Sequence, residues 1–390
     1  MDRSPLRVAV VAGLSAVVAV TGLAPASAGS AAGITLQAEP VPVRFGESVT
    51  LSGVVDPPDE GPVTIVEVST SDPVLSPVPS GPNGSFSVTF EPDRNVRLRA
   101  EWNGEQSDPL WVRVRPIVRV KLGQLRLFGK AKVTGRVRPA IAGARVEVSL
   151  RRGVKTIARR KVPLTAEGRF TARLPVRKPG RLRALAVFDH EDLLRASARS
   201  RPRKTPLPSL GQGSRGKVVR LLEQRLRSLG YWLTGINRAF DHRTGDAVLA
   251  FHKVQGMARV KSVRPATWRR LASPRRPSPR STKPAFHVEI DQTKQVLYVI
   301  RRGEISEIVH TSSGAGGATR DGVFRVHRKI AGYSPGRLYY PSYFDGLRAV
   351  HGWPSVPTYP ASHGCSRVPN WTAIHLHNVM PIGTVVRVYH

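Results

Sequence analysis

The residues best suited to chemistry lie together near the end of the sequence. Cys365 is the single cysteine among 390 residues, and it stands in the string Ser362-His363-Gly364-Cys365-Ser366-Arg367. A second histidine, His351, comes fourteen residues earlier. A cysteine nucleophile requires a base for its proton, a group that orients this base, and donors for the oxyanion that forms during attack. These residue types therefore predict acyl transfer through a thiol.

Each neighbour of the thiol has a chemical use that its type suggests. His351 and His363 are the two candidate bases, and their spacing does not decide between them. Gly364 has no Cβ, so a substrate carbonyl can approach the chain there. If a strand continues past the cysteine, Arg367 lies on the same face as Cys365. There it would lower the pKa of the thiol or hold a carboxylate of the substrate.

Two roles without catalysis are also open to Cys365. A lone buried cysteine is often no more than a small apolar residue of the core. A metal site would combine it with His351, His363 and a later histidine, His375 or His377. The gap of fourteen residues fits poorly with the short ligand spacings of metal sites. We therefore predict no metal and no organic cofactor, and expect the two later histidines at the surface or in packing contacts.

Short strands are predicted to hold this motif within residues 285–390. Apolar and β-branched runs indicate strands over 286–290, 295–300 and 304–309. Arg301-Arg302-Gly303 is expected to form the turn between the second and third of these strands. The last segment of the chain is therefore predicted to be β-rich.

The motif and its approach resemble a known catalytic domain. Val350-His351-Gly352, followed by Ser362-His363-Gly364-Cys365-Ser366-Arg367, resembles the active-site signature of the L,D-transpeptidase catalytic domain of YkuD type. Upstream, Thr319-Arg320-Asp321-Gly322-Val323-Phe324 is similar to the T-P-x-G-x-F string of that family, with Arg320 in place of proline. The resemblance covers residues 285–390 and implies a β-sandwich-like fold for them.

The resemblance implies an acyl transfer in two steps. Cys365 would be the nucleophile and His351 the general base, with the carbonyl of Gly352 orienting the imidazole. The thiol attacks the third residue of a peptidoglycan tetrapeptide stem and releases D-alanine, which leaves a thioester. An amine of a neighbouring stem peptide then takes the acyl group and completes a 3–3 crosslink. The implied substrates are thus a tetrapeptide donor and a stem-peptide acceptor of peptidoglycan.

The other residues of the motif are implied to support this chemistry. His363 would shape the pocket and, with backbone N–H groups near Gly364 and Cys365, would stabilise the oxyanion. Ser362 and Arg367 would support the site or the substrate. Two alternative functions stay open. One is an L,D-carboxypeptidase, in which water takes the acyl group, and the other is a catalytically inert protein that binds the cell wall.

Residues 209–273 carry a helical pattern. Apolar residues recur at helical spacing over 216–230 and again over 244–254. A third helical segment begins at Pro265, a residue suited to a first turn. The order of these segments resembles the three-helix peptidoglycan-binding domain, from which the chain departs at His252, where glutamine is usual. This resemblance implies binding to peptidoglycan.

Two earlier segments, 34–116 and 117–200, share one pattern of short strands and turns. The pattern recurs after about 85 residues, and such a repeat predicts two immunoglobulin-like β-sandwiches. Residues 201–208 and 274–284 are predicted linkers, because they are rich in proline and basic residues. With a catalytic domain at 285–390, the chain is expected to be a multidomain, mainly β protein.

The first 28 residues predict export. A basic start and an apolar run over 8–23 precede Ala26-Ser27-Ala28, a small-x-small cleavage pattern. The apolar run is shorter than the roughly 20 residues that span a bilayer as a helix. We expect cleavage after Ala28 and a location in the cell wall or elsewhere outside the cytoplasm, with membrane association if the signal is retained.

The charge of the chain is large and uneven. The chain has 61 basic and 27 acidic residues, a net charge of +34, of which residues 117–208 contribute +20 and residues 209–284 contribute +14. Such a charge predicts an anionic partner. Export argues against nucleic acid and leaves anionic cell-wall polymers or phospholipid headgroups. The alternative is an arginine-rich composition from a GC-rich genome. No stable protein partner is predicted.

Overall fold

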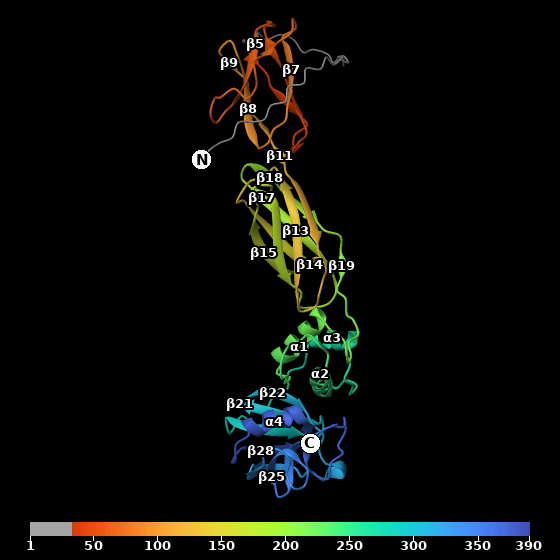
Figure 1. Cartoon of the computed structure of the whole chain (residues 1–390). Coiled ribbons are helices and arrows are strands. Elements are labelled where there is room, and N and C mark those ends of the chain that lie inside the picture. Colours follow the sequence, from red (N-terminus) through yellow and green to blue (C-terminus); the bar gives the residue numbers. More distant parts are fainter. Residues whose placement is uncertain (1–32) are drawn as a thin grey trace. The chain divides into compact units, whose positions relative to one another are not determined.

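The computed structural model describes residues 33–390, which are mainly β with four α-helices, and it confirms the predicted fold class (Figure 1). These residues form two compact units. The first contains residues up to 124 with 131–174 and 181–203, and the second contains 125–130, 175–180 and 204–390. No helix in the described part of the chain is long and apolar enough to cross a membrane. The predicted signal peptide lies outside the described residues.

The first β domain has two main sheets. One is built around strand β4, which pairs with β1, β2 and β7, and the other has the order β10-β8-β5-β6, with β9 added to β8. A short parallel pair, β3 and β11, completes the domain. The strands are β1 Gly33–Ile34, β2 Gln37–Glu39, β3 Val43–Arg44, β4 Val49–Asp56, β5 Pro62–Glu67, β6 Val78–Pro79, β7 Ser85–Phe90, β8 Val96–Trp102, β9 Glu105–Gln106, β10 Leu110–Val112 and β11 Val114–Arg115.

The second β domain repeats this plan with longer strands. A three-stranded sheet has the order β12-β13-β16, and a second sheet has the order β15-β14-β17-β18, with β19 added to β17. The strands are β12 Ile117–Leu122, β13 Lys130–Arg138, β14 Arg145–Arg152, β15 Lys155–Pro163, β16 Arg169–Pro175, β17 Arg181–His190, β18 Leu193–Arg199 and β19 Arg203–Lys204.

The predicted repeat is visible in matched packing contacts. A Cβ added to Gly53 in β4 would lie 2.5 Å from an atom of the Phe86 ring, and a Cβ added to Gly135 in β13 would lie 2.2 Å from an atom of the Phe170 ring. Each glycine thus leaves room for a buried phenylalanine of the neighbouring strand. The two sheets therefore correspond residue by residue, which permits a direct comparison of their surfaces.

Three helices form where the sequence predicts them: α1 Lys217–Ser228, α2 His242–Val254 and α3 Pro265–Ala272. The side chain of Asp241 caps α2, because it accepts the N–H of Thr244 at 3.0 Å. The side chain of His252 is buried and bonds the carbonyl of Val260 at 2.8 Å and the hydroxyl of Thr267 at 3.0 Å. This departure from the family pattern therefore has a structural role.

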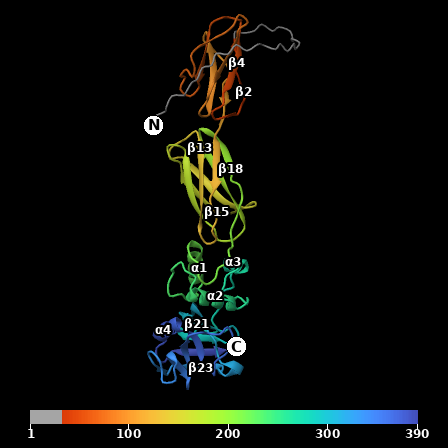
Figure 2. The ribbon, with the colours of Figure 1, turned by 45° about the vertical axis from the view of Figure 1, so that its right-hand side comes forward.

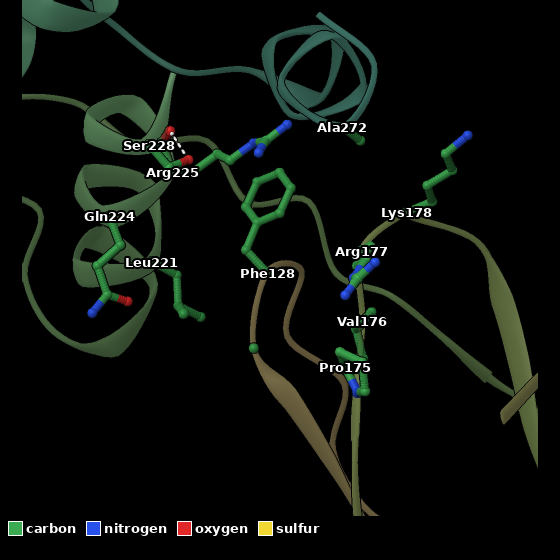
Figure 3. A pocket seen from close by; sticks show the side chains of 11 residues that line it. Phe128, Pro175, Val176, Arg177, Lys178, Leu221, Gln224, Arg225, Ser228 and Ala272 are labelled. Carbon is green, nitrogen blue, oxygen red and sulfur yellow. Dashed lines mark hydrogen bonds between the residues drawn. The ribbon is translucent and has the colours of Figure 1, made fainter. Parts of the chain in front are cut away.

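Helix α1 also faces two loop segments of its own unit, 125–130 and 175–180 (Figure 3). Together they line a pocket of about 450 Å³. Arg225 of α1 donates to the carbonyl of Leu271 at 2.9 Å, and its guanidinium lies 5.3 Å from the centre of the Phe128 ring. The ring of Phe128 lies 6.2 Å from that of Trp268. An aromatic residue of segment 125–130 therefore belongs to the core of the helices.

Two sheets and a helix build the C-terminal part of the second unit. The larger sheet has the order β22-β21-β20-β28-β23, and the smaller has the order β24-β25-β26-β27. Helix α4, Asn370–Val379, packs against β25 and β26. The strands are β20 Phe286–Asp291, β21 Val296–Arg301, β22 Glu304–His310, β23 Gly322–Arg325, β24 Arg328–Lys329, β25 Tyr339–Asp345, β26 Arg348–Trp353, β27 Ser366–Pro369 and β28 Val385–Tyr389.

Strand β21 is buried on both faces. Val296, Tyr298 and Ile300 belong to one core with helices α1 to α3, whereas Leu297 and Val299 belong to the core beneath α4. Figure 2 shows helix α2 beside the sheet that contains β21. Double burial explains why β21 carries no charged residue from Val296 to Ile300. The helices and the C-terminal sheets therefore share a core and form one unit.

Residues 274–284, predicted as a spacer that repels itself, are instead bound along their length. The side-chain amide of Gln255 pairs with both the N–H and the carbonyl of Arg275, at 2.8 and 2.9 Å. The carboxylate of Glu289 accepts the N–H groups of Arg280 and Ser281, at 2.8 and 2.9 Å. The segment is therefore part of the second unit, a contact that composition alone did not indicate.

Candidate active site

Strands β26 and β27 bring the segments that carry the predicted catalytic residues together. They are parallel neighbours in which His351 lies opposite Arg367. Cys365 directly precedes β27, which begins at Ser366. The N–H of Ala349, at the start of β26, donates to the sulfur of Cys365 at 3.4 Å. Sheet pairing thus joins two segments that are separated in the sequence.

The thiol of Cys365 is held as a protonated group. Burial raises the pKa of Cys365, and the N–H of Ala349 and the charges of Arg367 and Arg348 oppose this effect only in part. The sulfur also faces the carbonyl of Leu347 at 3.8 Å. Arg367 therefore acts on the thiol in the predicted direction, but desolvation outweighs it. Attack by this sulfur requires a base that removes its proton.

His351 has the properties of that base. Its Nδ1 lies 2.8 Å from the carbonyl oxygen of Gly352. A carbonyl can only accept a hydrogen bond, so Nδ1 carries the proton and Nε2 presents a free lone pair. Burial, with a smaller contribution from Arg367, lowers the pKa of His351 to about 4. The imidazole is therefore neutral at neutral pH, and the carbonyl of Gly352 lies where the family resemblance implied an orienting group.

Two glycines fix the backbone around these groups. A Cβ at Gly352 would lie 2.7 Å from Oδ1 of Asn370, so α4 can approach β26 closely. Gly364 has φ +129°, and a Cβ there would lie 2.8 Å from Nε of Arg348 and 3.0 Å from the carbonyl oxygen of Ala318. The close contacts with Arg348 and Ala318 therefore explain why residue 364 is a glycine. The sequence had instead suggested that the missing Cβ makes room for a substrate carbonyl.

Ser362 closes the turn that presents the thiol. Its hydroxyl accepts the N–H of Gly364 at 3.1 Å and donates to the carbonyl of Cys365. The N–H of Gly364, expected near the oxyanion, therefore faces Ser362 in this structure. His363 is exposed on the same turn, and within residues 33–390 no hydrogen bond joins its imidazole to Cys365 or His351. Its place in the pocket stays a prediction.

Arg367 is anchored beside the thiol and the imidazole. Its guanidinium stacks on the ring of Trp353 at 4.5 Å and donates to the carbonyl of Ala361 at 3.1 Å. Its backbone is tied to the neighbouring segment, because the hydroxyl of Thr311 donates to the Arg367 carbonyl at 2.8 Å. A fixed, half-buried cation therefore lies where an anionic part of a substrate would be attracted.

The structure shows a network of ion pairs and hydrogen bonds that the sequence did not predict. Asp345 accepts from Arg348 at 2.9 Å and from Arg320, the residue that replaces the family's proline. Arg348 also donates to the carbonyl of Ala318 at 2.9 Å, and Thr319 donates to the carbonyl of Gly364 at 2.9 Å. These contacts hold the turn before Cys365. The arginine at position 320, where the family has proline, was the one feature of the sequence that could have indicated this network.

Helix α2 contributes a buried amine close to the site. Nζ of Lys253 lies 2.7 Å from Nδ1 of His310 and donates to the carbonyls of Gln295 and Thr311, both at 2.9 Å. Thr311 in turn contacts Ser366, next to the cysteine, through their hydroxyls at 2.6 Å. This link crosses between two sequence segments, so no local pattern predicted it.

The later histidines have structural contacts, as expected. His375 bonds Glu307 at 2.6 Å and stacks on Trp232 at 4.7 Å, and the ring of His377 lies 5.2 Å from that of Tyr340. Across residues 33–390, no three histidine, cysteine, aspartate or glutamate side chains are grouped so that they could hold a metal ion.

Comparison with known proteins identifies the family of the C-terminal domain. Residues 285–388 match the family model described as YkuD, the L,D-transpeptidase catalytic domain. An L,D-transpeptidase structure from Xylanimonas cellulosilytica is 38% identical, with 48% of this chain and 100% of that chain covered and a TM-score of 0.45. One from Stackebrandtia nassauensis is 23% identical, with coverage of 48% and 97% and a TM-score of 0.31. Curated proteins give no match.

Proposed function

Because the chain belongs to the L,D-transpeptidase family through residues 285–388, we propose that it forms 3–3 crosslinks in peptidoglycan with Cys365 as its nucleophile. The observation that carries this proposal is the protonation and orientation of His351. Its Nδ1 is fixed by the carbonyl of Gly352, its pKa is low, and it lies on β26, the strand whose Ala349 N–H donates to the sulfur of Cys365.

The first half-reaction transfers the acyl group to sulfur. His351 accepts the proton of Cys365 as the sulfur attacks the carbonyl carbon of the third residue of the tetrapeptide stem. The tetrahedral intermediate then collapses, His351 returns the proton to the departing amine, and D-alanine leaves. A neutral thiol beside a neutral imidazole suits this general-base route, since neither group must carry a buried charge before the substrate arrives.

The second half-reaction releases the enzyme. An amine of a neighbouring stem peptide attacks the thioester, His351 takes a proton from that amine, and the proton then returns to the sulfur of Cys365. The products are a crosslinked pair of stems and the original thiol. If water takes the place of the amine, the product is a tripeptide, which is the carboxypeptidase alternative.

The rest of the chain would bring this chemistry to its substrate. Export by the first 28 residues would place the enzyme outside the cytoplasm, in or near the cell wall. The helices of residues 209–273 would bind peptidoglycan, as their resemblance implies. Since these helices share a core with β21, wall binding would hold the catalytic domain against its substrate.

Mass spectrometry of the protein with a disaccharide-tetrapeptide tests the proposal. We expect a thioester adduct, release of D-alanine and a crosslinked dimer, all lost in Cys365→Ala. Cys365→Ser, which keeps the size of the side chain, should fold normally and be inactive or nearly so. Tripeptide without dimer would favour the carboxypeptidase, and wall binding without any turnover would favour the inert wall-binding protein.

A further inference from the structure

The outward face of the β12-β13-β16 sheet is strongly basic. Alternation along each strand sends one set of side chains into the core of the second β domain and the other set outward. The outward set includes eight basic residues and no acidic one. The basic residues are Arg119 and Lys121 of β12, Lys130, Lys132, Arg136 and Arg138 of β13, and Arg169 and Arg173 of β16.

Like charges are placed opposite one another in this sheet. Arg119 of β12 lies directly across from Arg136 of β13. Such a pair destabilises a sheet, because the two cations repel at close range. A hollow of about 450 Å³ lies between the strands and is lined by Arg119, Lys121, Arg136 and Arg169, together with Thr134 and Thr171. An anion in the hollow would relieve the repulsion.

The protein supplies little countercharge of its own. The side-chain ion pairs found in residues 117–203 join His190 to Asp192 and Arg195 to Asp189, away from this face. The nearest acid in the turn before β16 is Glu167, whose carboxylate accepts from the hydroxyl of Thr165. This hydrogen bond lowers the pKa of Glu167, the charges of Arg169 and Arg136 add to the effect, and Arg136 donates to the backbone carbonyl of Glu167 at 2.9 Å. One carboxylate offsets only a small part of the charge of this face, so most of that charge is available to an external anion.

The first β domain provides an internal comparison. Its matching sheet has the same strand pairing, since Val54 lies across from Ser85 as part of the β4–β7 ladder. None of the residues at the eight matching positions is basic, and one is acidic. In the same order as the basic residues above, they are Thr35, Gln37, Ser48, Thr50, Val54, Asp56, Ser85 and Thr89. An arginine-rich composition would affect both copies, so it does not explain the difference.

We propose that this face binds a linear polymer with phosphodiester groups, of the kind found among anionic cell-wall polymers. Nine residues of β13 span about 30 Å, long enough for several phosphates to be engaged at once. Arginine suits phosphate because its guanidinium donates two parallel hydrogen bonds. A hollow between basic strands fits a chain better than it fits a flat bilayer. This inference does not depend on the chemistry of Cys365.

Binding of the full chain to poly(glycerol phosphate), measured by calorimetry over a range of salt concentrations, tests this site. The triple variant Arg119→Thr, Arg136→Val, Arg169→Ser installs the matching residues of the first β domain. The control variant Arg159→Ser, Arg160→Ser, Lys161→Ser removes three charges from β15, in the opposite sheet. We expect the first to bind about tenfold more weakly or worse with a shallower salt dependence, and the control to lose less than about twofold.

Three outcomes would overturn the proposal. Equal losses in both variants would mean that the polymer responds to net charge and not to this face. Equal affinity for polyglutamate would exclude phosphodiester recognition, and binding to phosphatidylglycerol vesicles without binding to the polymer would indicate a membrane surface. Circular dichroism and thermal unfolding of each variant verify folding. If the triple variant does not fold, Lys121→Gln, again the residue of the first domain, supports the same comparison with Lys161→Gln as its control.

Discussion

Lowering the pH should leave the enzyme active well below the range in which ordinary histidines become charged. The reaction needs neutral His351, whose pKa burial lowers to about 4 from an ordinary 6.5. At pH 5, about nine-tenths of such a histidine is neutral, whereas about 3% of an ordinary one would be. The structure therefore predicts activity at pH 5 about thirtyfold higher than an unperturbed base would allow.

The assay is the release of D-alanine from a tetrapeptide donor, with kcat/KM measured from pH 4 to pH 8. The kcat/KM of the wild type should stay nearly level down to about pH 5 and fall below it. His363→Ala is the matched control, since this exposed histidine in the turn before Cys365 should not determine the pH dependence of kcat/KM. His351→Gln should lower kcat by about 10²-fold or more, the usual contribution of a general base.

A profile that falls with a midpoint near pH 6.5 would refute the state assigned to His351. So would a midpoint that shifts in His363→Ala, because the titrating base would then be the exposed histidine. Circular dichroism at each pH separates loss of the base from loss of the fold. Titration of the free tetrapeptide identifies any midpoint that belongs to the substrate.

Four further predictions concern the frame of the site. Because the pKa of His351 is lower in the folded state, the unfolded chain binds more protons below pH 6.5. The free energy of unfolding should therefore fall from pH 6.5 toward pH 4. An unfolding midpoint temperature that stays constant over this range in the wild type but not in His351→Gln would contradict this. Gly364→Ala should cost about 1–3 kcal/mol because of its positive φ and the contact with Arg348, and an unchanged unfolding midpoint would disprove it, with Gly235→Ala as the control in open space without a positive φ. Lys253→Met leaves two buried carbonyls without this donor and should cost about 1–3 kcal/mol by chemical denaturation, whereas exposed Lys294→Met should cost less. Arg320→Pro should change stability by no more than about 1 kcal/mol, since the lost ion pair is exposed on the arginine side; a loss of several kcal/mol would show that Asp345 depends on it.

Local sequence patterns predicted the parts of the site that depend on neighbouring residues. The run over 295–300 and the turn at Arg301-Arg302-Gly303 predicted β21 and β22. The string around Cys365 predicted a thiol nucleophile with His351 or His363 as its base, and only the family resemblance favoured His351. The orientation of His351 by the carbonyl of Gly352 also agrees with the resemblance. In each case the residues involved are close in sequence or belong to a recognisable motif.

Contacts between distant segments were not predictable in this way. The bond from Lys253 to Thr311 joins a helix to a strand end, and no periodicity within either one indicates the other. The burial of Cys365 raises its pKa although Arg367 is close, and only the packed structure decides which effect is larger. The segment 274–284 had the composition of a spacer, but its hydrogen bonds come from Gln255 and Glu289.

Strand β21 has a consequence for any attempt to divide the chain. Removing the helices would leave Val296, Tyr298 and Ile300 exposed to water on one face of a sheet. It would also leave the carbonyls that now accept from Lys253 without this donor. Exposed apolar strands of this kind promote aggregation. We therefore expect residues 285–390 alone to be poorly soluble. The smallest soluble enzyme should therefore begin before α1, and the helices and the catalytic sheets should move as one rigid body with no flexible tether between them.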